Sequence, residues 1–96
     1  MLNLTSKQQE LIKDLIKKYI PNITVWVYGS RVKGTSTSKS DLDLAAFVSP
    51  KQKIEIINLR EAFEESNLPF KVDLFAWYEI PDFFRQNIEQ EHIVLI

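Results

Sequence analysis

The residues of this chain best suited to chemistry lie at the junction of two apolar segments in its first half. Gly29 and Ser30 follow the first segment, and Asp41 and Asp43 begin the second, with ten residues between the two pairs. A glycine lets the backbone approach a phosphate closely, and a serine can donate both its amide and its hydroxyl. Two carboxylates one residue apart on a strand share a face and can hold divalent ions. The pattern predicts chemistry on a nucleoside triphosphate.

A third carboxylate, Asp73, lies in a later apolar segment, where an acid is uncommon. If its strand pairs beside that of Asp41 and Asp43, all three can reach two ions, which in two-metal sites lie about 3.5–4 Å apart. Carboxylates and phosphate oxygens suit Mg²⁺. We therefore expect two Mg²⁺ ions here, and repulsion among the carboxylates when no cation is bound. The alternative is an ordinary structural role for each, with Asp73 paired to Lys71 or Arg31.

Two better-known motifs are excluded. Residues 29–36 partly match the P-loop pattern G-x-x-x-x-G-K-[ST], but Thr35 stands where the lysine is needed. Leu42 and Leu44 make the acidic segment a half-buried strand that lacks the glycine of a calcium loop. Arg31 and Lys33 remain as candidate triphosphate contacts, with solvated loop positions as the alternative.

Hydrophobic periodicity predicts the elements that must position these residues. The expected helices span residues 5–19, 51–66 and 81–91, with one helical turn at 30–33. Segments rich in β-branched and aromatic residues predict strands at 23–28, 41–48 and 70–76. The closing residues 93–96 fit either a short strand or a buried tail. This order predicts a mixed α/β (α+β) fold in which helices pack on a small sheet.

Length and composition limit the class of protein. A chain of 96 residues is expected to form a single domain over residues 1–96. The absence of cysteine excludes disulfides and thiolate metal sites. No apolar run approaches about 20 residues, so we expect a soluble, cytoplasmic protein with no membrane contact. Because 12 basic residues face 13 acidic ones, direct binding to nucleic acid is disfavoured.

The remaining aromatic residues favour packing over chemistry. Trp77 could stack on a base, but a core or partner contact is the stronger prediction. His92 is the sole histidine and is expected to pack or to lie at the surface rather than to catalyse. Phe83 and Phe84 are expected to anchor the last helix.

The string G-S-R-V-K-G-T-S-T-S-K-S-D-L-D-L resembles the signature of the DNA polymerase β-type nucleotidyltransferase superfamily, which is Gly-Ser, ten residues, then Asp-x-Asp. The resemblance is strongest to the minimal nucleotidyltransferases of bacteria and archaea and covers nearly the whole chain. It implies a polymerase β-like nucleotidyltransferase core in which Asp41 and Asp43 bind two Mg²⁺ ions. Asp73 would share a metal and help deprotonate the attacking hydroxyl. The nucleotide-binding residues would be Gly29, Ser30 and Arg31, with ATP as the substrate.

The same resemblance implies a partner. Minimal nucleotidyltransferases are commonly paired with a HEPN-domain toxin, on which they act as antitoxins by adenylylating a tyrosine. For this chain that implies magnesium-dependent transfer of AMP from ATP to a partner hydroxyl. The acceptor is expected on another protein or on a second copy, so a homo- or hetero-oligomer is possible. The alternatives are a non-catalytic antitoxin that neutralises its partner by binding, and a small-molecule nucleotidyltransferase.

Overall fold

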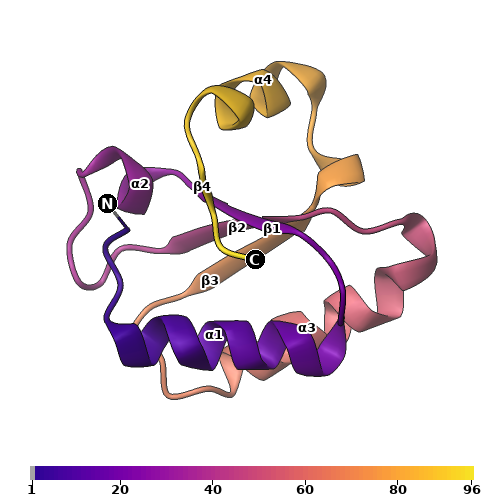
Figure 1. Ribbon diagram of the computed structural model, residues 1–96, viewed down its shortest axis with the longest axis horizontal. Helices are drawn as coiled ribbons and strands as arrows, with labels where there is room; N and C mark the ends of the chain where they lie inside the picture. The colour runs from indigo at the N-terminus through magenta and orange to yellow at the C-terminus, as the bar shows by residue number, and fades with distance from the viewer. Residues whose placement is uncertain (1) are drawn as a thin grey trace.

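A four-stranded mixed sheet forms the centre of the protein. The structure, a computed structural model, describes residues 2–96. The strands lie in the order β3-β2-β1-β4; β1 is antiparallel to β2 and β4, whereas β2 and β3 are parallel. In Figure 1 the helices α1 and α3 lie below the sheet and α4 lies above it. The strands are β1 (Val25–Tyr28), β2 (Leu42–Ala46), β3 (Val72–Ala76) and β4 (Ile93–Val94).

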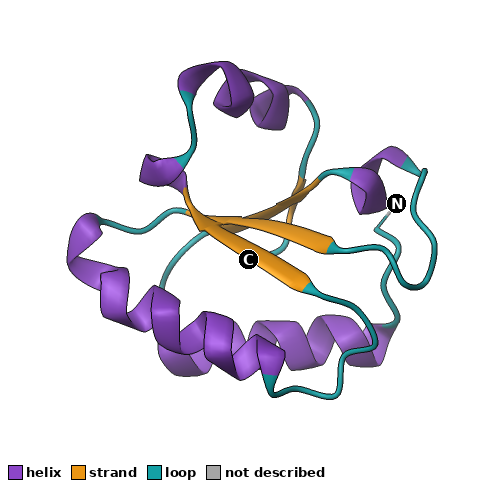
Figure 2. Cartoon of the chain, turned by 180° about the vertical axis from the view of Figure 1, so that it is seen from behind, coloured by secondary structure: helices purple, strands orange, loops and turns teal. Residues whose placement is uncertain are grey.

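The helices flank this sheet on both sides, as the view from behind also shows (Figure 2). They are α1 (Ser6–Tyr19), α2 (Ser30–Lys33), α3 (Lys53–Glu64) and α4 (Asp82–Gln90), with short 3₁₀ turns η1 (Pro50–Gln52) and η2 (Trp77–Glu79). The predicted mixed α/β architecture is confirmed, and β4 resolves the ambiguity of the closing residues in favour of a short strand.

The N-terminus of α1 is stabilised by the capping box that its sequence encodes. The Gln8 amide donates to Thr5 Oγ1 at 3.1 Å, and the Thr5 amide donates to Gln8 Oε1 at 3.0 Å. Two otherwise free amides are satisfied in this way. Ile12 and Ile16 lie on the buried face of the helix. The helix therefore begins and faces inward as its pattern predicts.

The parallel pairing of β2 with β3 is possible because α3 connects them. Parallel neighbours need a crossover connection, and a helix is the usual one.

Strand β2 is shorter than predicted, so Asp41 lies just before it rather than within it. Strand β1 likewise loses the first two residues of the predicted segment 23–28.

A separate group of buried apolar side chains packs on each face of the sheet. The larger group lies between the sheet and the helices α1 and α3, and includes Ile12, Leu44 and Leu59. The smaller group lies under α4 and includes Tyr28 and Ile88. Since side chains alternate along a strand, the residues between the buried leucines of β2 must face α4.

The prediction that Phe83 and Phe84 anchor α4 is wrong for Phe83, whereas Phe84 packs edge-on against Tyr28 with ring centroids 5.9 Å apart. Phe83 is 73% exposed and Phe84 42%, whereas Ile88 is 1% exposed. At 3.6 residues per turn, Phe83 and Ile88 point about 140° apart around the helix axis. Only the narrow side of α4 that carries Ile88 reaches the sheet, so Phe83 stays in solvent.

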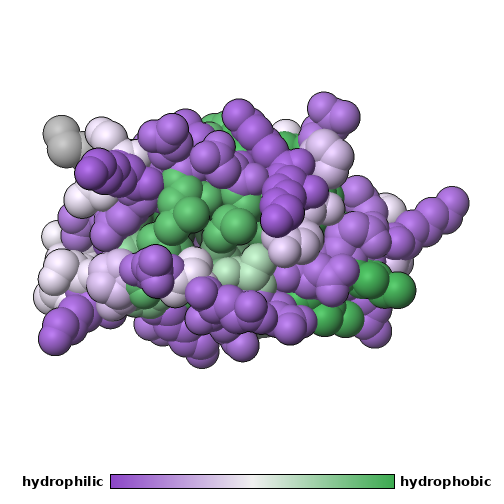
Figure 3. Space-filling view, turned by 90° about the horizontal axis from the view of Figure 1, so that it is seen from below, coloured by the Kyte–Doolittle hydropathy of each residue, from purple (hydrophilic) through white to green (hydrophobic). Residues whose placement is uncertain are grey.

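The face formed by α1 and α3 is largely hydrophilic, with a group of hydrophobic residues in its middle (Figure 3). On α3, Ile54 and Ile57 are 68% and 47% exposed. Within residues 2–96, no helix combines the length and the apolar character needed to cross a membrane.

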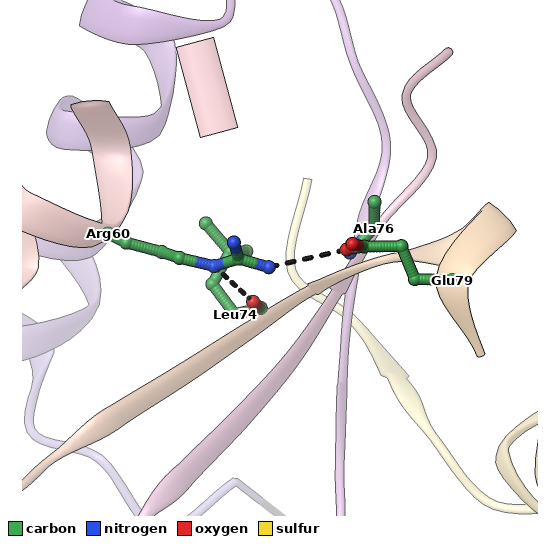
Figure 4. A network of polar contacts seen from close by, with 4 residues as sticks. All are labelled: Arg60, Leu74, Ala76 and Glu79. Carbon is green, nitrogen blue, oxygen red and sulfur yellow. Dashed lines mark hydrogen bonds and ion pairs between the residues drawn. The ribbon is translucent and has the colours of Figure 1, made fainter. Parts of the chain in front are cut away.

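Strand β3 is an edge strand whose C-terminal part is held by the side chains of Arg60 and Glu79 (Figure 4). Arg60 Nε donates to the Leu74 carbonyl at 2.9 Å, and Arg60 Nη2 lies 3.3 Å from Glu79 Oε1. The same Glu79 oxygen accepts a hydrogen bond from the Ala76 amide at 3.3 Å. Unpaired edge groups invite pairing with other chains, so these contacts protect the edge and hold the strand that carries Asp73.

Candidate active site

Asp43 and Asp73 occupy directly paired positions on the parallel strands β2 and β3. Residues paired in register on neighbouring strands point to the same face of a sheet. The leucines beside them, Leu42, Leu44 and Leu74, are buried against α1 and α3, so both carboxylates project toward the α4 side. The expected pairing of the third strand beside the second is confirmed.

Asp41 lies immediately before β2 and is exposed, near enough to Asp43 for their charges to interact. Lys71 Nζ contacts Asp73 Oδ1 at 3.2 Å, the ion pair considered above as an alternative for Asp73. In the part of the chain that the structure describes, no three acidic, histidine or cysteine side chains are gathered as a preformed metal cluster. The three aspartates therefore share one region without converging on one point.

The electrostatics of this region oppose the ionisation of Asp43. Burial, followed by the charges of Asp73 and Asp41, raises the pKa of Asp43 to about 6, while Lys71 acts in the opposite direction. Tyr28, paired with Asp43 across β1 and β2, has its pKa raised to about 12 by burial and by the charges of Asp43 and Asp73. Excess negative charge on oxygen donors fits a hard divalent cation such as Mg²⁺.

We expect the ligand-free protein to lose stability relative to an Asp43→Asn variant as the pH rises. The folded-state pKa of Asp43 is raised, so the stabilisation from its protonated form is complete below its ordinary value of 3.8 and is lost as the pH passes about 6. Asparagine is neutral throughout. Urea unfolding of both proteins in a chelator, at about pH 4.5 and about pH 7.5, should therefore show a larger advantage for Asp43→Asn at the higher pH. An equal difference at the two pH values would contradict the raised pKa.

Gly29 connects β1 to α2 in a conformation that suits glycine alone. Its φ is 82° and its ψ is −154°. A Cβ at this position would overlap Asp43 Oδ2 and lie 3.3 Å from Asp43 Cγ. The Gly29 carbonyl accepts hydrogen bonds from the amides of Val32 and Lys33 at 3.0 and 3.1 Å. The glycine therefore lets the backbone that leads to Ser30 pass directly against the Asp43 carboxylate.

The structure does not support Arg31 as a phosphate ligand. Its side chain is 2% exposed, so a solvated loop position is also wrong. The guanidinium donates to the carbonyls of Asn3, Ser38 and Ser40. Arg31 binds these carbonyls of the loop and the N-terminal segment, and it is not among the residues that line the pocket beside Asp43.

Lys33, by contrast, lines a pocket of about 160 Å³ beside Asp43. The wall opposite is formed by α4, whose three lining residues have the spacing of a single helix face, and by Glu91 directly after the helix. That spacing is the signal by which the sequence could have identified them. The pocket is lined by Tyr28, Gly29, Lys33, Asp43, Phe84, Asn87, Ile88 and Glu91.

A larger pocket of about 320 Å³ lies elsewhere, near the N-terminus of α1. Its lining includes Arg31, Lys39 and Pro69 but no carboxylate. A site for a metal-bound triphosphate needs acidic ligands, so the smaller pocket is the better candidate.

The tryptophans and His92 pack against one another. The rings of Trp26 and His92 stack with centroids 3.7 Å apart, and Trp77 stacks on Phe47 at 4.7 Å. His92 Nδ1 also lies 2.8 Å from the Ile88 carbonyl. The packing roles predicted for Trp77 and His92 are confirmed.

Comparison with known proteins identifies the family to which this chain is similar. The family model described as polymerase beta, nucleotidyltransferase matches residues 10–96. The chain is 38% identical over 95 residues to the probable protein adenylyltransferase MntA of Haemophilus influenzae, an alignment that covers 98% of this chain and 83% of that protein.

Solved structures share the fold. A toxin–antitoxin crystal structure with AMP-PNP aligns with a TM-score of 0.71 and 22% identity, over 92% of this chain and 72% of the other. A Shewanella oneidensis MNT antitoxin in complex with its tri-AMPylated HEPN toxin aligns with a TM-score of 0.54 and 17% identity, over 92% and 68% of the two chains.

Proposed function

This chain belongs to the polymerase beta nucleotidyltransferase family, and we propose that it transfers AMP from ATP to a hydroxyl of a HEPN-domain partner, as that partner's antitoxin. The observation that carries the proposal is the direct pairing of Asp43 with Asp73 on the face where Gly29 approaches Asp43. The relative from Haemophilus influenzae, named a probable protein adenylyltransferase, supports the reaction type. The complex of an MNT antitoxin with a tri-AMPylated HEPN toxin supports the partner.

Each residue of the site has a separate role in this proposal. Asp41, Asp43 and Asp73 would hold two Mg²⁺ ions, which when bound would supply positive charge against the phosphates. Gly29 and Ser30 would bind the triphosphate through the backbone and the Ser30 hydroxyl. These contacts orient the α-phosphorus toward the incoming hydroxyl.

The transfer itself is a displacement at phosphorus. The acceptor oxygen bonds to the α-phosphorus as the bond to the bridging oxygen breaks, and pyrophosphate leaves. A carboxylate oxygen of Asp73 takes the proton of the acceptor hydroxyl. A tyrosine of the partner is the proposed acceptor.

The pocket between α2 and α4 is the proposed place of the nucleotide. Lys33 would face the phosphates, and Phe84 would form an apolar wall for the nucleoside. Asn87 on that helix and Glu91 directly after its end supply polar groups. The pocket opens beside Asp43, which is where the reacting phosphate must lie.

Labelled ATP tests this function directly. The protein is incubated with α-labelled ATP, Mg²⁺ and the purified product of its neighbouring gene. We expect label on that product, and no label when a chelator is present. Tight complex formation without label would instead support a non-catalytic antitoxin. Label recovered only on a small molecule would support the antibiotic-modifying type of nucleotidyltransferase.

A further inference from the structure

Arg31 is the one charged side chain that is buried among residues 2–96, at 2% exposure. Burying a charge is costly unless the group is fully hydrogen-bonded. None of the ion pairs found in the described part of the chain includes Arg31, so its partners are backbone carbonyls. A charge buried at such cost, on a residue that does not line the pocket beside Asp43, calls for a role of its own.

The guanidinium of Arg31 connects three separate segments. Nε and Nη2 donate to the Ser40 carbonyl at 3.0 and 2.7 Å, and Nη2 donates also to the Ser38 carbonyl at 3.1 Å. Nη1 donates to the Asn3 carbonyl. The guanidinium carbon lies 4.1 Å from the centroid of the Phe70 ring. The N-terminal segment, the loop after α2 and the approach to β3 are thus fixed to one side chain.

These contacts are adjacent in sequence to the residues of the proposed site. Ser40 directly precedes Asp41, and Arg31 itself directly follows Ser30. The Leu42 amide then donates to the Lys71 carbonyl at 2.8 Å, which continues the link from the loop to the segment before Asp73. Arg31 therefore links the segment that carries Ser30 to the residue directly before Asp41.

We propose that Arg31 is a positioning residue, which holds Asp41 in place relative to Ser30 by binding the backbone of the loop between them. This inference rests on the proposed nucleotidyl transfer. Arg31 touches neither the nucleotide nor a metal ion in this role. Its effect is to keep Ser30 and Asp41 at the separation that the reaction needs, because small displacements of reacting groups have large effects on rate.

Lysine cannot replace arginine here. The guanidinium is a planar fork with five donors, whereas the ammonium of lysine is a single point charge on a flexible chain. The three donors of a lysine ammonium share one nitrogen, so in Arg31→Lys they cannot reach all the carbonyls that Nε, Nη1 and Nη2 of Arg31 reach from separate positions. We expect the backbone around Asp41 to loosen while the charge of the side chain is retained.

The experiment compares Arg31→Lys with a matched control, Arg60→Lys. Arg60 also donates to a backbone carbonyl, that of Leu74 on β3, which lies outside residues 38–42. In Arg31→Lys we expect amide hydrogens of residues 38–42 to exchange about 10-fold faster without ligand, and the half-saturating Mg²⁺ concentration for transfer to rise about 10-fold. In Arg60→Lys the exchange of residues 38–42 should not change, even where thermal stability falls by a similar amount.

The outcomes that overturn the proposal are distinct. Wild-type exchange and wild-type Mg²⁺ dependence in Arg31→Lys would refute it, and so would an equal change in the exchange of residues 38–42 in Arg60→Lys. If Arg31→Lys does not fold, Phe70→Leu decides, since it removes the ring under the guanidinium and keeps apolar volume. Exchange in residues 38–42 about 3-fold faster would then support the proposal, and unchanged exchange would refute it. A wild-type protein whose melting temperature does not rise with Mg²⁺ and AMP-PNP would instead refute the proposed function, and with it the catalytic consequence for Arg31.

Discussion

Replacing Asp41 by asparagine is expected to abolish nucleotidyl transfer while leaving the fold unchanged. Asp41 is exposed and precedes β2, and its side chain takes part in none of the hydrogen bonds or ion pairs found among residues 2–96. The substitution keeps the shape of the side chain and removes the charge that would hold a cation. We expect transfer to fall by about 10³-fold or more, since charge stabilisation is commonly the largest single contribution to such catalysis.

The measurement is the rate of label transfer from ATP, alongside the melting temperature of the ligand-free protein. Asp14→Asn is the matched control, because Asp14 is also exposed but lies on α1, outside the pocket. The control should transfer label at the wild-type rate. The melting temperature of Asp41→Asn should stay close to that of the wild type, because Asp43 loses a repelling neighbour while Arg31 and Lys71 lose an attracting one. Transfer by Asp41→Asn within tenfold of the wild-type rate would remove Asp41 from the site.

Gly29→Ala should damage both stability and transfer, far more than Gly34→Ala. The two glycines have nearly equal positive φ values, 82° and 81°. A Cβ on Gly29 would overlap the Asp43 carboxylate, whereas a Cβ on Gly34 would meet nothing within 4 Å. The ψ of −154° also puts Gly29 in a region that is essentially restricted to glycine, whereas the left-handed conformation of Gly34 is open to other residues at moderate cost.

We expect Gly34→Ala to lower the free energy of unfolding by about 1 kcal/mol, the ordinary penalty of a left-handed alanine. Gly29→Ala should lower it by about 2–4 kcal/mol, and the displaced Asp43 should reduce transfer more than about 100-fold. Urea unfolding and the label-transfer rate of both variants test this. Similar losses in the two variants would show that backbone strain alone matters and that Asp43 does not press against Gly29.

Local features of the fold followed from the sequence because they depend on neighbours along the chain. The capping box at Thr5, the helical turn from Ser30 and the strand character around Leu42 each need only a few residues to specify them. The candidate carboxylates Asp41 and Asp43 were identifiable for the same reason, since a two-residue spacing on a strand defines a shared face.

The lining of the pocket could not be predicted in the same way. Asn87 on the amphipathic helix α4 and Glu91 directly after it are ordinary polar residues, and only the placement of α4 over the sheet brings them near Lys33. Phe83 shows an error of the other kind, a residue given a role that it does not have. It was expected to be buried, but the narrow contact of α4 with the sheet leaves it exposed.

What the sequence determined by itself was the chemistry available: a flexible Gly29 and paired acids near one another on the chain, with a third acid on a later strand. Only the tertiary structure decided where the side chains of these residues lie relative to one another. The register of β2 against β3 set Asp43 beside Asp73, and the carbonyls of the loop turned Arg31 inward, away from the pocket. The physical reason is that strand pairing and burial are contacts between distant segments, whose free energy depends on the whole packed core rather than on any local pattern.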